Sequence, residues 1–168
     1  MTFDISVILE DFAESHIEKT FEWVSDPDLQ KDFLIRKNPT RESHLEYFKN
    51  VLRDATQQVF AIYAKNAHVG NCGLKNISDK NAELWIYIGE VLYRKKGVGR
   101  EATSMLLRKG FEVFGLMQIY VHVAEFNTNA RRLYDKLGFK ETSLSQDSKT
   151  WEGRGCNIIR MELKKECK

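Results

Sequence analysis

The amino-acid sequence predicts a single α/β (α+β) domain in which a mixed, mostly antiparallel sheet is flanked by helices. Three consecutive strand-like segments in the middle of the chain are separated only by short turns, which favours antiparallel neighbours. The last of them is followed by an amphipathic helix and a further apolar strand, and such a unit pairs its two strands in parallel. We therefore expect about six or seven strands, flanked by about four helices.

The first third of the chain is predicted to hold one strand and two helices. Loose alternation predicts a strand over Phe3–Leu9, and apolar residues at helical spacing predict a helix over Phe12–Ser25. Asp26-Pro27 ends this helix, and the stretch up to Pro39 is the least regular part of the sequence. Thr40 can cap a second helix. Its apolar stripe consists of Leu45, Phe48, Leu52 and Ala55.

The remaining elements are separated by turn residues, and a glycine follows each of the last two helices. The predicted strands cover Gln58–Ala64, Val69–Leu74, Ala82–Gly89, Leu116–Ala124, Phe139–Thr142 and Ile158–Leu163. The predicted helices cover Arg100–Phe114 and Asn127–Leu137. Because no repeat or Ser/Gly-rich linker interrupts this pattern, residues 1–168 are predicted to form one domain.

Composition excludes several classes of protein. The 26 Lys and Arg against 24 Asp and Glu give a net charge of +2, which lacks the basic excess typical of nucleic-acid binding. No apolar run is long enough to span a membrane, and the N-terminus does not resemble a secretory signal. Cys72, Cys156 and Cys167 are odd in number and far apart, which favours neither disulfides nor a metal site. We expect a cytoplasmic protein without a metal, a nucleic-acid partner or a membrane partner.

The clearest chemical signal is a basic, glycine-containing loop between the buried strand and the helix after it. It reads Arg94-Lys95-Lys96-Gly97-Val98-Gly99-Arg100. The two glycines let the backbone turn tightly and expose its N–H groups, and a helix N-terminus favours an anion. The loop therefore predicts a cradle for a phosphate or pyrophosphate, with a solvated basic turn as the alternative. It is not a P-loop, because Arg100-Glu101 follows the last glycine.

A second motif opens the next helix. It reads Asn127-Thr128-Asn129-Ala130-Arg131-Arg132-Leu133-Tyr134, followed by Lys136-Leu137-Gly138-Phe139. The succession of strand, R-x-x-G-x-G, helix, strand and N-x-N-A-x-x-L-Y-x-K-L-G-F resembles the GNAT superfamily of acyl-CoA-dependent N-acyltransferases. The resemblance spans roughly Glu83 to Phe139. It implies a GNAT fold and an N-acetyltransferase whose co-substrate is acetyl-CoA.

The resemblance also implies roles for individual residues. The coenzyme pyrophosphate would bind the backbone amides of the Arg94–Arg100 loop, and pantetheine would pair with the strand end at Ile88, Gly89 and Glu90. Asn127 would contact coenzyme A, and Tyr134 would protonate the leaving thiolate. The two lie on one helical face, and a phenol stays protonated at neutral pH. The alternative for Tyr134 is a half-buried core aromatic.

Two residues are candidates for the base that deprotonates the acceptor amine. Glu83 shares a strand face with Trp85 and Tyr87 just before the coenzyme loop, where several family members carry a catalytic Glu. His122 lies on the neighbouring strand, where some members place a Glu, and histidine titrates near neutral pH. The alternatives are a solvated strand charge for Glu83 and a core histidine for His122.

The acceptor is predicted from the region between the first two helices. Its W-x-x-D-P and H-L-x-x-F segments resemble GNAT branches that acetylate nucleotide-linked amino sugars or protein N-termini. Aromatic residues can stack on a base or sugar, and Arg36 or Lys37 can meet a diphosphate. We expect a small-molecule amine on a nucleotide-linked amino sugar. A protein N-terminus, a polyamine and a non-catalytic coenzyme-A-binding module stay open as alternatives, as does a homodimer.

Overall fold

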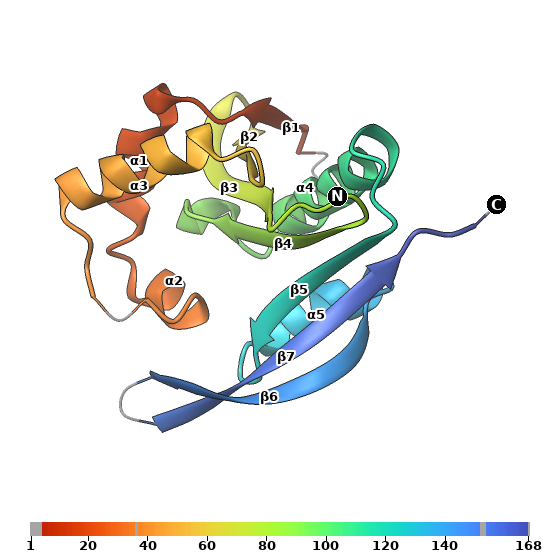
Figure 1. The fold of residues 1–168 in the computed structure, drawn as a ribbon. Coiled ribbons are helices and arrows are strands. Elements are labelled where there is room, and N and C mark those ends of the chain that lie inside the picture. Colours follow the sequence, from red (N-terminus) through yellow and green to blue (C-terminus); the bar gives the residue numbers. More distant parts are fainter. Residues whose placement is uncertain (1–4, 36, 152–153, 168) are drawn as a thin grey trace.

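The computed structural model describes residues 5–35, 37–151 and 154–167 (Figure 1). In this part of the chain, strands form one seven-stranded sheet in the order β1-β2-β3-β4-β5-β7-β6. Neighbouring strands are antiparallel except β4 and β5, which are parallel. The fold class, the antiparallel run of three strands and the parallel crossover are therefore confirmed.

The elements have the following bounds in the described residues. The strands are β1 (Val7–Asp11), β2 (Gln58–Ala64), β3 (Ala67–Lys75), β4 (Asn81–Ile88), β5 (Gln118–Ala124), β6 (Lys140–Trp151) and β7 (Arg154–Lys164). The α-helices are α1 (Ile17–Trp23), α2 (Pro27–Asp32), α3 (Arg41–Arg53), α4 (Val98–Arg108) and α5 (Thr128–Lys136). A π-helical turn, Lys109–Val113, continues α4. The hydroxyl of Thr40 caps α3 as predicted, accepting a hydrogen bond from the Ser43 N–H at 3.1 Å.

The two last strands are much longer than their apolar stretches indicate. They form a hairpin in which Lys140 pairs with Glu162 near one end and Trp151 with Arg154 at the other. Backbone hydrogen bonds between the two strands do not depend on side-chain type. Apolar alternation in the sequence therefore does not predict the polar middle of this hairpin.

Helix α2 lies in the stretch that was predicted to be irregular. Pro27 occupies the first turn, where its missing N–H costs nothing, and the Asp26 carboxylate accepts a hydrogen bond from the Asp28 N–H at 2.8 Å. Helix α1 already ends at Trp23, so the Asp-Pro pair that was expected to end it starts a new helix instead. Within α2, Leu29 is buried and anchors this short helix to the protein.

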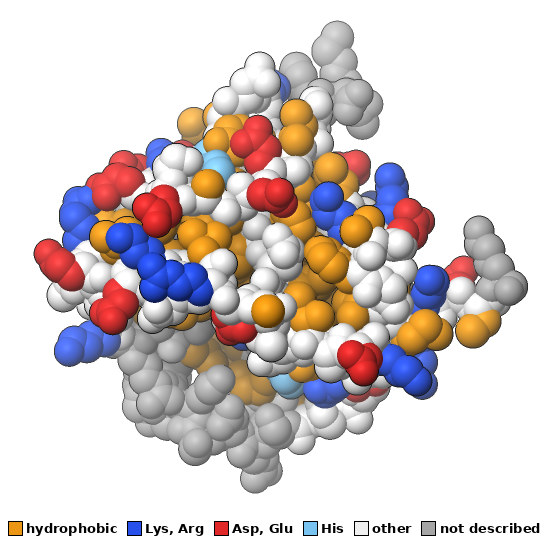
Figure 2. Space-filling view, turned by 45° about the horizontal axis from the view of Figure 1, so that its top comes forward, with side chains coloured by type: hydrophobic (Ala, Val, Ile, Leu, Met, Phe, Trp, Pro, Cys, Tyr) orange, Lys and Arg blue, Asp and Glu red, His pale blue; other side chains and the backbone are white. Residues whose placement is uncertain are grey.

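The two faces of the sheet carry different helices. Leu84, Ile86 and Ile88 of β4 belong to the main core, which includes residues of α4 and α5. Trp85 of the same strand packs on the smaller core beneath α1 and α3. In a space-filling view, hydrophobic side chains gather near the centre of one face, with acidic and basic side chains around them (Figure 2).

Strands β4 and β5 pair only at their beginnings and then diverge (Figure 1). The parallel register runs from Asn81 opposite Gln118 to Glu83 opposite Tyr120. At the far end of β4, the N–H groups of Gly89 and Glu90 both donate to the carbonyl of Val69, at 2.8 and 3.0 Å. Two residues thus oppose one, as in a β-bulge, and the end of β4 turns away from β5.

Gly89 is required at this bend because the indole of Trp23 packs directly on it. A Cβ at this position would lie 2.0 Å from the Trp23 ring. The Trp23 ring N–H donates to the Glu90 carboxylate at 3.0 Å, so the C-terminal end of α1 is anchored on the end of β4. Trp23 is accordingly a core residue, with 5% of its surface exposed.

Candidate active site

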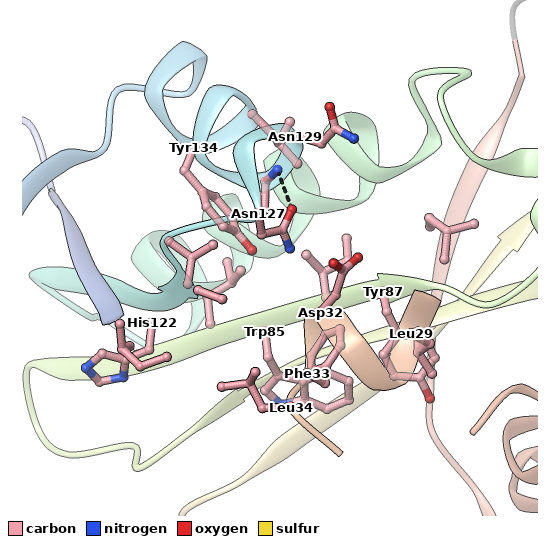
Figure 3. A pocket seen from close by; sticks show the side chains of 18 of the residues that line it. Leu29, Asp32, Phe33, Leu34, Trp85, Tyr87, His122, Asn127, Asn129 and Tyr134 are labelled. Carbon is pink, nitrogen blue, oxygen red and sulfur yellow. Dashed lines mark hydrogen bonds between the residues drawn. The ribbon is translucent and has the colours of Figure 1, made fainter. Parts of the chain in front are cut away.

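The divergence of β4 and β5 opens a cleft of about 390 Å³ (Figure 3). Its walls come from α2, β4, β5 and the first two turns of α5. The α2 wall includes Asp32 and Phe33, and the β4 wall includes Trp85 and Ile88. The β5 wall includes His122 and Ala124, and the α5 wall includes Asn127 and Tyr134. The cleft brings together the two predicted base candidates, the predicted acid and the predicted pantetheine-binding strand.

The coenzyme loop has the geometry expected of an anion cradle. Gly97 caps α4 in the left-handed conformation, with φ of 85°, which glycine adopts without strain. Gly99 lies in the first turn of α4, and a Cβ there would be 3.8 Å from its nearest neighbour, a side-chain atom of Ile88. The fold therefore leaves room for a side chain at position 99, so packing within the protein does not explain the glycine. Close approach of a ligand to the backbone would explain it. The amides that open α4 have no carbonyls within the helix to bind.

Arg94 differs from the other basic residues of this loop because its guanidinium is already engaged. Its Nε donates to the Ile88 carbonyl at 2.8 Å, and Nη2 donates to the Gly89 carbonyl at 3.1 Å and to the Asp26 carboxylate at 2.6 Å. Burial would raise the pKa of the Asp26 carboxyl, but hydrogen bonds from Arg94 and Asp28 hold it below its usual range. Arg94 thus clamps the end of β4 to the start of α2.

The other charged residues of the loop and strand end divide into two sets. Lys95, Lys96 and Arg100 are exposed and able to meet phosphates. The Glu90 side chain instead pairs with Lys19 at 2.7 Å, and hydrogen bonds from Lys19 and Trp23 hold its pKa below the usual range. The Glu90 side chain is therefore engaged within the protein, and its backbone N–H donates to the Val69 carbonyl while its carbonyl accepts from the Tyr93 N–H.

Asn127 and Tyr134 both border the cleft from α5. The Asn127 side-chain carbonyl caps the helix by accepting a hydrogen bond from the Ala130 N–H at 3.1 Å, which leaves its amide group on the cleft side (Figure 3). The Tyr134 ring is buried against Phe139, and burial raises its pKa well above the usual range. Its phenol therefore stays protonated and keeps a proton to donate. Tyr134 is both a core aromatic and a residue of the cleft.

Glu83 and His122 form one hydrogen-bonded pair. The Nδ1 of His122 lies 3.0 Å from the Glu83 carboxylate, which also accepts from the Asn76 amide at 3.1 Å. The Lys75 ammonium is 3.6 Å away from the same carboxylate. The Glu83 side chain is 11% exposed, whereas that of His122 is 40% exposed. Glu83 thus orients the imidazole, and in the described part of the chain no hydrogen bond engages the other ring nitrogen of His122.

A second cavity, of about 450 Å³, adjoins the cleft beneath α1 and α3. Leu29, Phe33, Lys75, Trp85 and Tyr87 line both spaces. The further aromatic lining residues are Tyr47 and Phe48. Its charged lining residues are Lys37 and Lys75, and no Asp or Glu is present among the described lining residues.

The predicted acceptor residues meet this cavity only in part. Lys37 lines it, and Arg36 lies outside the described residues. Phe33 is 41% exposed and stands at the junction of the two spaces, so it is not a core residue. The sequence interpretation missed Asp32 and Leu29 because it missed α2; the Asp26-Pro27 start signal was the available clue.

Two further observations concern the described part of the chain. Within it, no group of three His, Cys, Asp or Glu side chains is placed to hold a metal ion. None of its helices has the length and apolar character needed to cross a bilayer.

Comparison with known proteins identifies the class to which this site belongs. Residues 6–140 match the family model described as an acetyltransferase (GNAT) domain. The chain therefore belongs to the GNAT acetyltransferase family, and the resemblance seen in the two motifs is confirmed. It is an acetyl-CoA-dependent N-acetyltransferase domain, with acetyl-CoA as co-substrate.

Individual relatives are distant. An uncharacterized protein of Methanocaldococcus jannaschii is 25% identical over 86% of this chain, which corresponds to 30% of that protein. The alpha/beta-tubulin-N-acetyltransferase 9 of Mus musculus is 22% identical over 83% of this chain and 64% of its own length. The chain thus spans less than two thirds of both relatives. The solved spermidine N-acetyltransferase of Vibrio cholerae, in complex with CoA and spermine, superposes with a TM-score of 0.88 at 20% identity, covering 94% of this chain and 95% of its own, and shares the fold.

A substitution at Gly99 tests whether the loop before α4 binds the coenzyme. Gly99→Val places a branched side chain where a ligand would approach the start of α4, so the dissociation constant for coenzyme A should rise by roughly tenfold or more. Isothermal calorimetry measures the change. The Gly99→Ala variant is the matched control for folding, because its Cβ meets no close contact. A folded Gly99→Val protein with unchanged affinity would remove this loop from the coenzyme site.

Proposed function

We propose that this domain acetylates a primary amine carried on an acceptor with an aromatic or apolar body and a negative charge. A nucleotide-linked amino sugar has this chemistry. The observation that carries the proposal is the second cavity, whose aromatic walls carry Lys37 and Lys75 but no carboxylate among the described lining residues. Aromatic faces stack on a base or sugar ring, and lysines attract a phosphate.

Two other acceptors stay as alternatives, each supported by one relative. A protein N-terminus is supported by the tubulin acetyltransferase, and an apolar first side chain would also suit the aromatic cavity. A polyamine is supported by the spermine complex of the structural neighbour. Its additional cations would face Lys37 and Lys75 in the second cavity, and like charges in a partly buried space disfavour binding. A cytoplasmic location and a homodimer stay predictions from the sequence.

The residues of the cleft suggest how the transfer proceeds. His122, oriented by Glu83, accepts a proton from the acceptor ammonium, directly or through a water molecule. The neutral amine then attacks the thioester carbonyl, a carbon–nitrogen bond forms, and the carbon–sulfur bond breaks. Tyr134 donates its proton to the departing sulfur and regains one from the acetylated nitrogen through solvent. In this scheme Glu83 is a positioning residue, and His122 and Tyr134 are the catalytic residues.

Tyr134→Phe tests the acid. The variant keeps the buried ring and removes only the hydroxyl, so turnover should fall roughly 10²-fold while the dissociation constant for coenzyme A stays nearly unchanged. Steady-state kinetics and calorimetry measure the two quantities. Wild-type turnover in this variant would limit Tyr134 to packing.

The pH–rate profiles of His122→Gln and Glu83→Gln test the base. If His122 is the base, His122→Gln should abolish the acidic limb and leave a rate that follows the fraction of neutral amine. Glu83→Gln should keep the limb with a lower rate throughout, because the imidazole is still present but is no longer oriented by the carboxylate. The opposite result, a limb abolished only in Glu83→Gln, would make Glu83 the base.

An acceptor panel tests the proposed substrate class. The wild-type protein, supplied with acetyl-CoA, should acetylate a nucleotide-linked amino sugar with a higher kcat/KM than spermidine or a peptide N-terminus. Lys37→Glu should lower kcat/KM for the nucleotide-linked acceptor and raise it for spermidine, because the cavity charge is reversed. Spermidine as the best substrate of the wild-type protein would overturn this proposal. Coenzyme binding without turnover of any amine would favour the non-catalytic module.

A further inference from the structure

Helix α2 places a carboxylate inside the cleft. Asp32 lies in the cavity between the β4 side chains and the start of α5 (Figure 3). Among the described residues that line the cleft, Asp32 and Glu83 are the carboxylates. Glu83 is engaged by His122, Asn76 and Lys75. In the described part of the chain, Asp32 forms no side-chain hydrogen bond or ion pair, so its carboxylate oxygens have no direct partner there.

Asp32 is solvent-exposed where it lines the cleft, but its surroundings still disfavour the charged form of its carboxyl. Burial raises the pKa of its carboxyl, and the carboxylates of Asp28 and Asp26 act in the same direction. The cations of Lys31 and Arg94 act in the opposite direction but do not reverse the shift. A carboxylate kept in such a place is stabilised when a cation binds beside it.

The position of Asp32 is defined by the packing of its helix. Asp26 and Pro27 start α2, Arg94 ties Asp26 to the end of β4, and Leu29 is buried. Asp32 is the last residue of α2, and Phe33, which lines both the cleft and the second cavity, follows it directly. One short segment therefore presents a carboxylate to the cleft and an aromatic ring to the space next to it.

We propose that Asp32 binds the acceptor's ammonium group in the cleft and is a specificity-determining residue for acetyl transfer. This inference rests on the proposed function, since it concerns the same acceptor site. Asp32 receives the cationic end of the acceptor, and the second cavity, with Lys37 and Lys75, receives its aromatic, anionic body. The two spaces together select an acceptor with a positive amine at one end and a negative group at the other.

The test compares Asp32→Asn with Asp28→Asn, a matched change on the same helix outside both cavities. For the best acceptor of the panel, KM should rise roughly tenfold in Asp32→Asn, with a smaller change in kcat, and stay within about twofold in Asp28→Asn. Asp32→Glu should recover part of the loss. Coenzyme A affinity should be unchanged in all three variants.

A weakly basic analogue of the acceptor separates charge recognition from packing. An alkoxyamine in place of the amine is uncharged at neutral pH, so its KM should be nearly the same in Asp32→Asn and the wild-type protein. Equal KM losses for the charged and uncharged acceptors would overturn the proposal. So would a wild-type KM for the charged acceptor in Asp32→Asn.

The unfolding temperature of Asp32→Asn distinguishes a binding role from a structural role, because the two roles predict changes of opposite sign. Because the carboxyl pKa is raised in the folded protein, the ionised form opposes folding once the pH exceeds the ordinary carboxyl pKa. Asp32→Asn should therefore unfold at the same or a higher temperature than the wild-type protein near neutral pH, and the two should converge in acid. A clearly lower temperature would assign Asp32 to stability instead.

Failure of the proposed function gives a different pattern. If the wild-type protein acetylates a polyamine best, the substrate class is wrong, yet Asp32→Asn should still raise KM for that cationic acceptor. If no panel member is acetylated, calorimetric titration of the CoA-saturated protein with the same charged acceptors tests Asp32 without turnover. Binding that is equally strong in the wild-type protein and Asp32→Asn, or undetectable in both, would then overturn the proposal.

Discussion

The short parallel pairing between β4 and β5 is the constraint on which the site depends. Only the segment from Asn81 to Glu83 pairs with β5, so the rest of β4 faces the cleft with backbone groups that β5 does not use. Backbone N–H and C=O groups of a buried strand that lack hydrogen-bond partners cost free energy. In the proposed reaction, an extended ligand arm lies along β4 and supplies these partners, and the acceptor enters the same gap from the face of α1 and α3. The place where the sheet opens thus becomes the place where two substrates meet.

The opening is held by contacts from outside the sheet. Arg94 donates to two carbonyls at the end of β4 and to Asp26, and such charge-assisted hydrogen bonds are stronger than neutral ones. Trp23 packs on Gly89 and donates to Glu90 at the same strand end. Both the coenzyme loop and the helices of the acceptor side are therefore attached to the same bent strand end. A shift of this strand would move both binding regions together.

The charges around the two cavities are unevenly distributed. The cleft is bordered by the carboxylates of Asp32 and Glu83 together with the cations of Lys75 and Arg94. The second cavity is bordered by Lys37 and Lys75, without a carboxylate among its described lining residues. Glu83 is hydrogen-bonded to His122, so the residues that appear to compete for one role are two parts of one unit. Lys75 lies near Glu83 and lines both spaces, which places it at the electrostatic boundary between them.

Local sequence was sufficient for the elements whose signals are local. Apolar periodicity located β2 and β4 closely, and the Gly97 and Asn127 motifs marked the two helix starts of the coenzyme side. Periodicity found α3 but not its buried face: Leu45 and Leu52 are exposed, and Ala55 lies beyond the end of the helix. His44 and Val51 are buried beside Phe48 instead, because packing against α1 and the sheet decides which face of the helix is covered. The polar hairpin of β6 and β7 escaped, because its backbone pairing does not depend on apolar alternation. Helix α2 also escaped, although Asp26-Pro27 is a start signal, because a helix this short has little periodicity to detect.

By itself, the sequence determined the fold class, which follows from periodicity. Its two local motifs resembled the GNAT family, and that resemblance implied the residue types available for acetyl transfer. Only the tertiary structure decided that Glu83 binds His122, that Arg94 is a clamp, and that Asp32 enters the cleft. These relations join residues far apart along the chain, and their distances depend on how strands diverge and helices pack. No local pattern encodes a separation of that kind, so the chemistry of the acceptor site is determined only when the chain has folded.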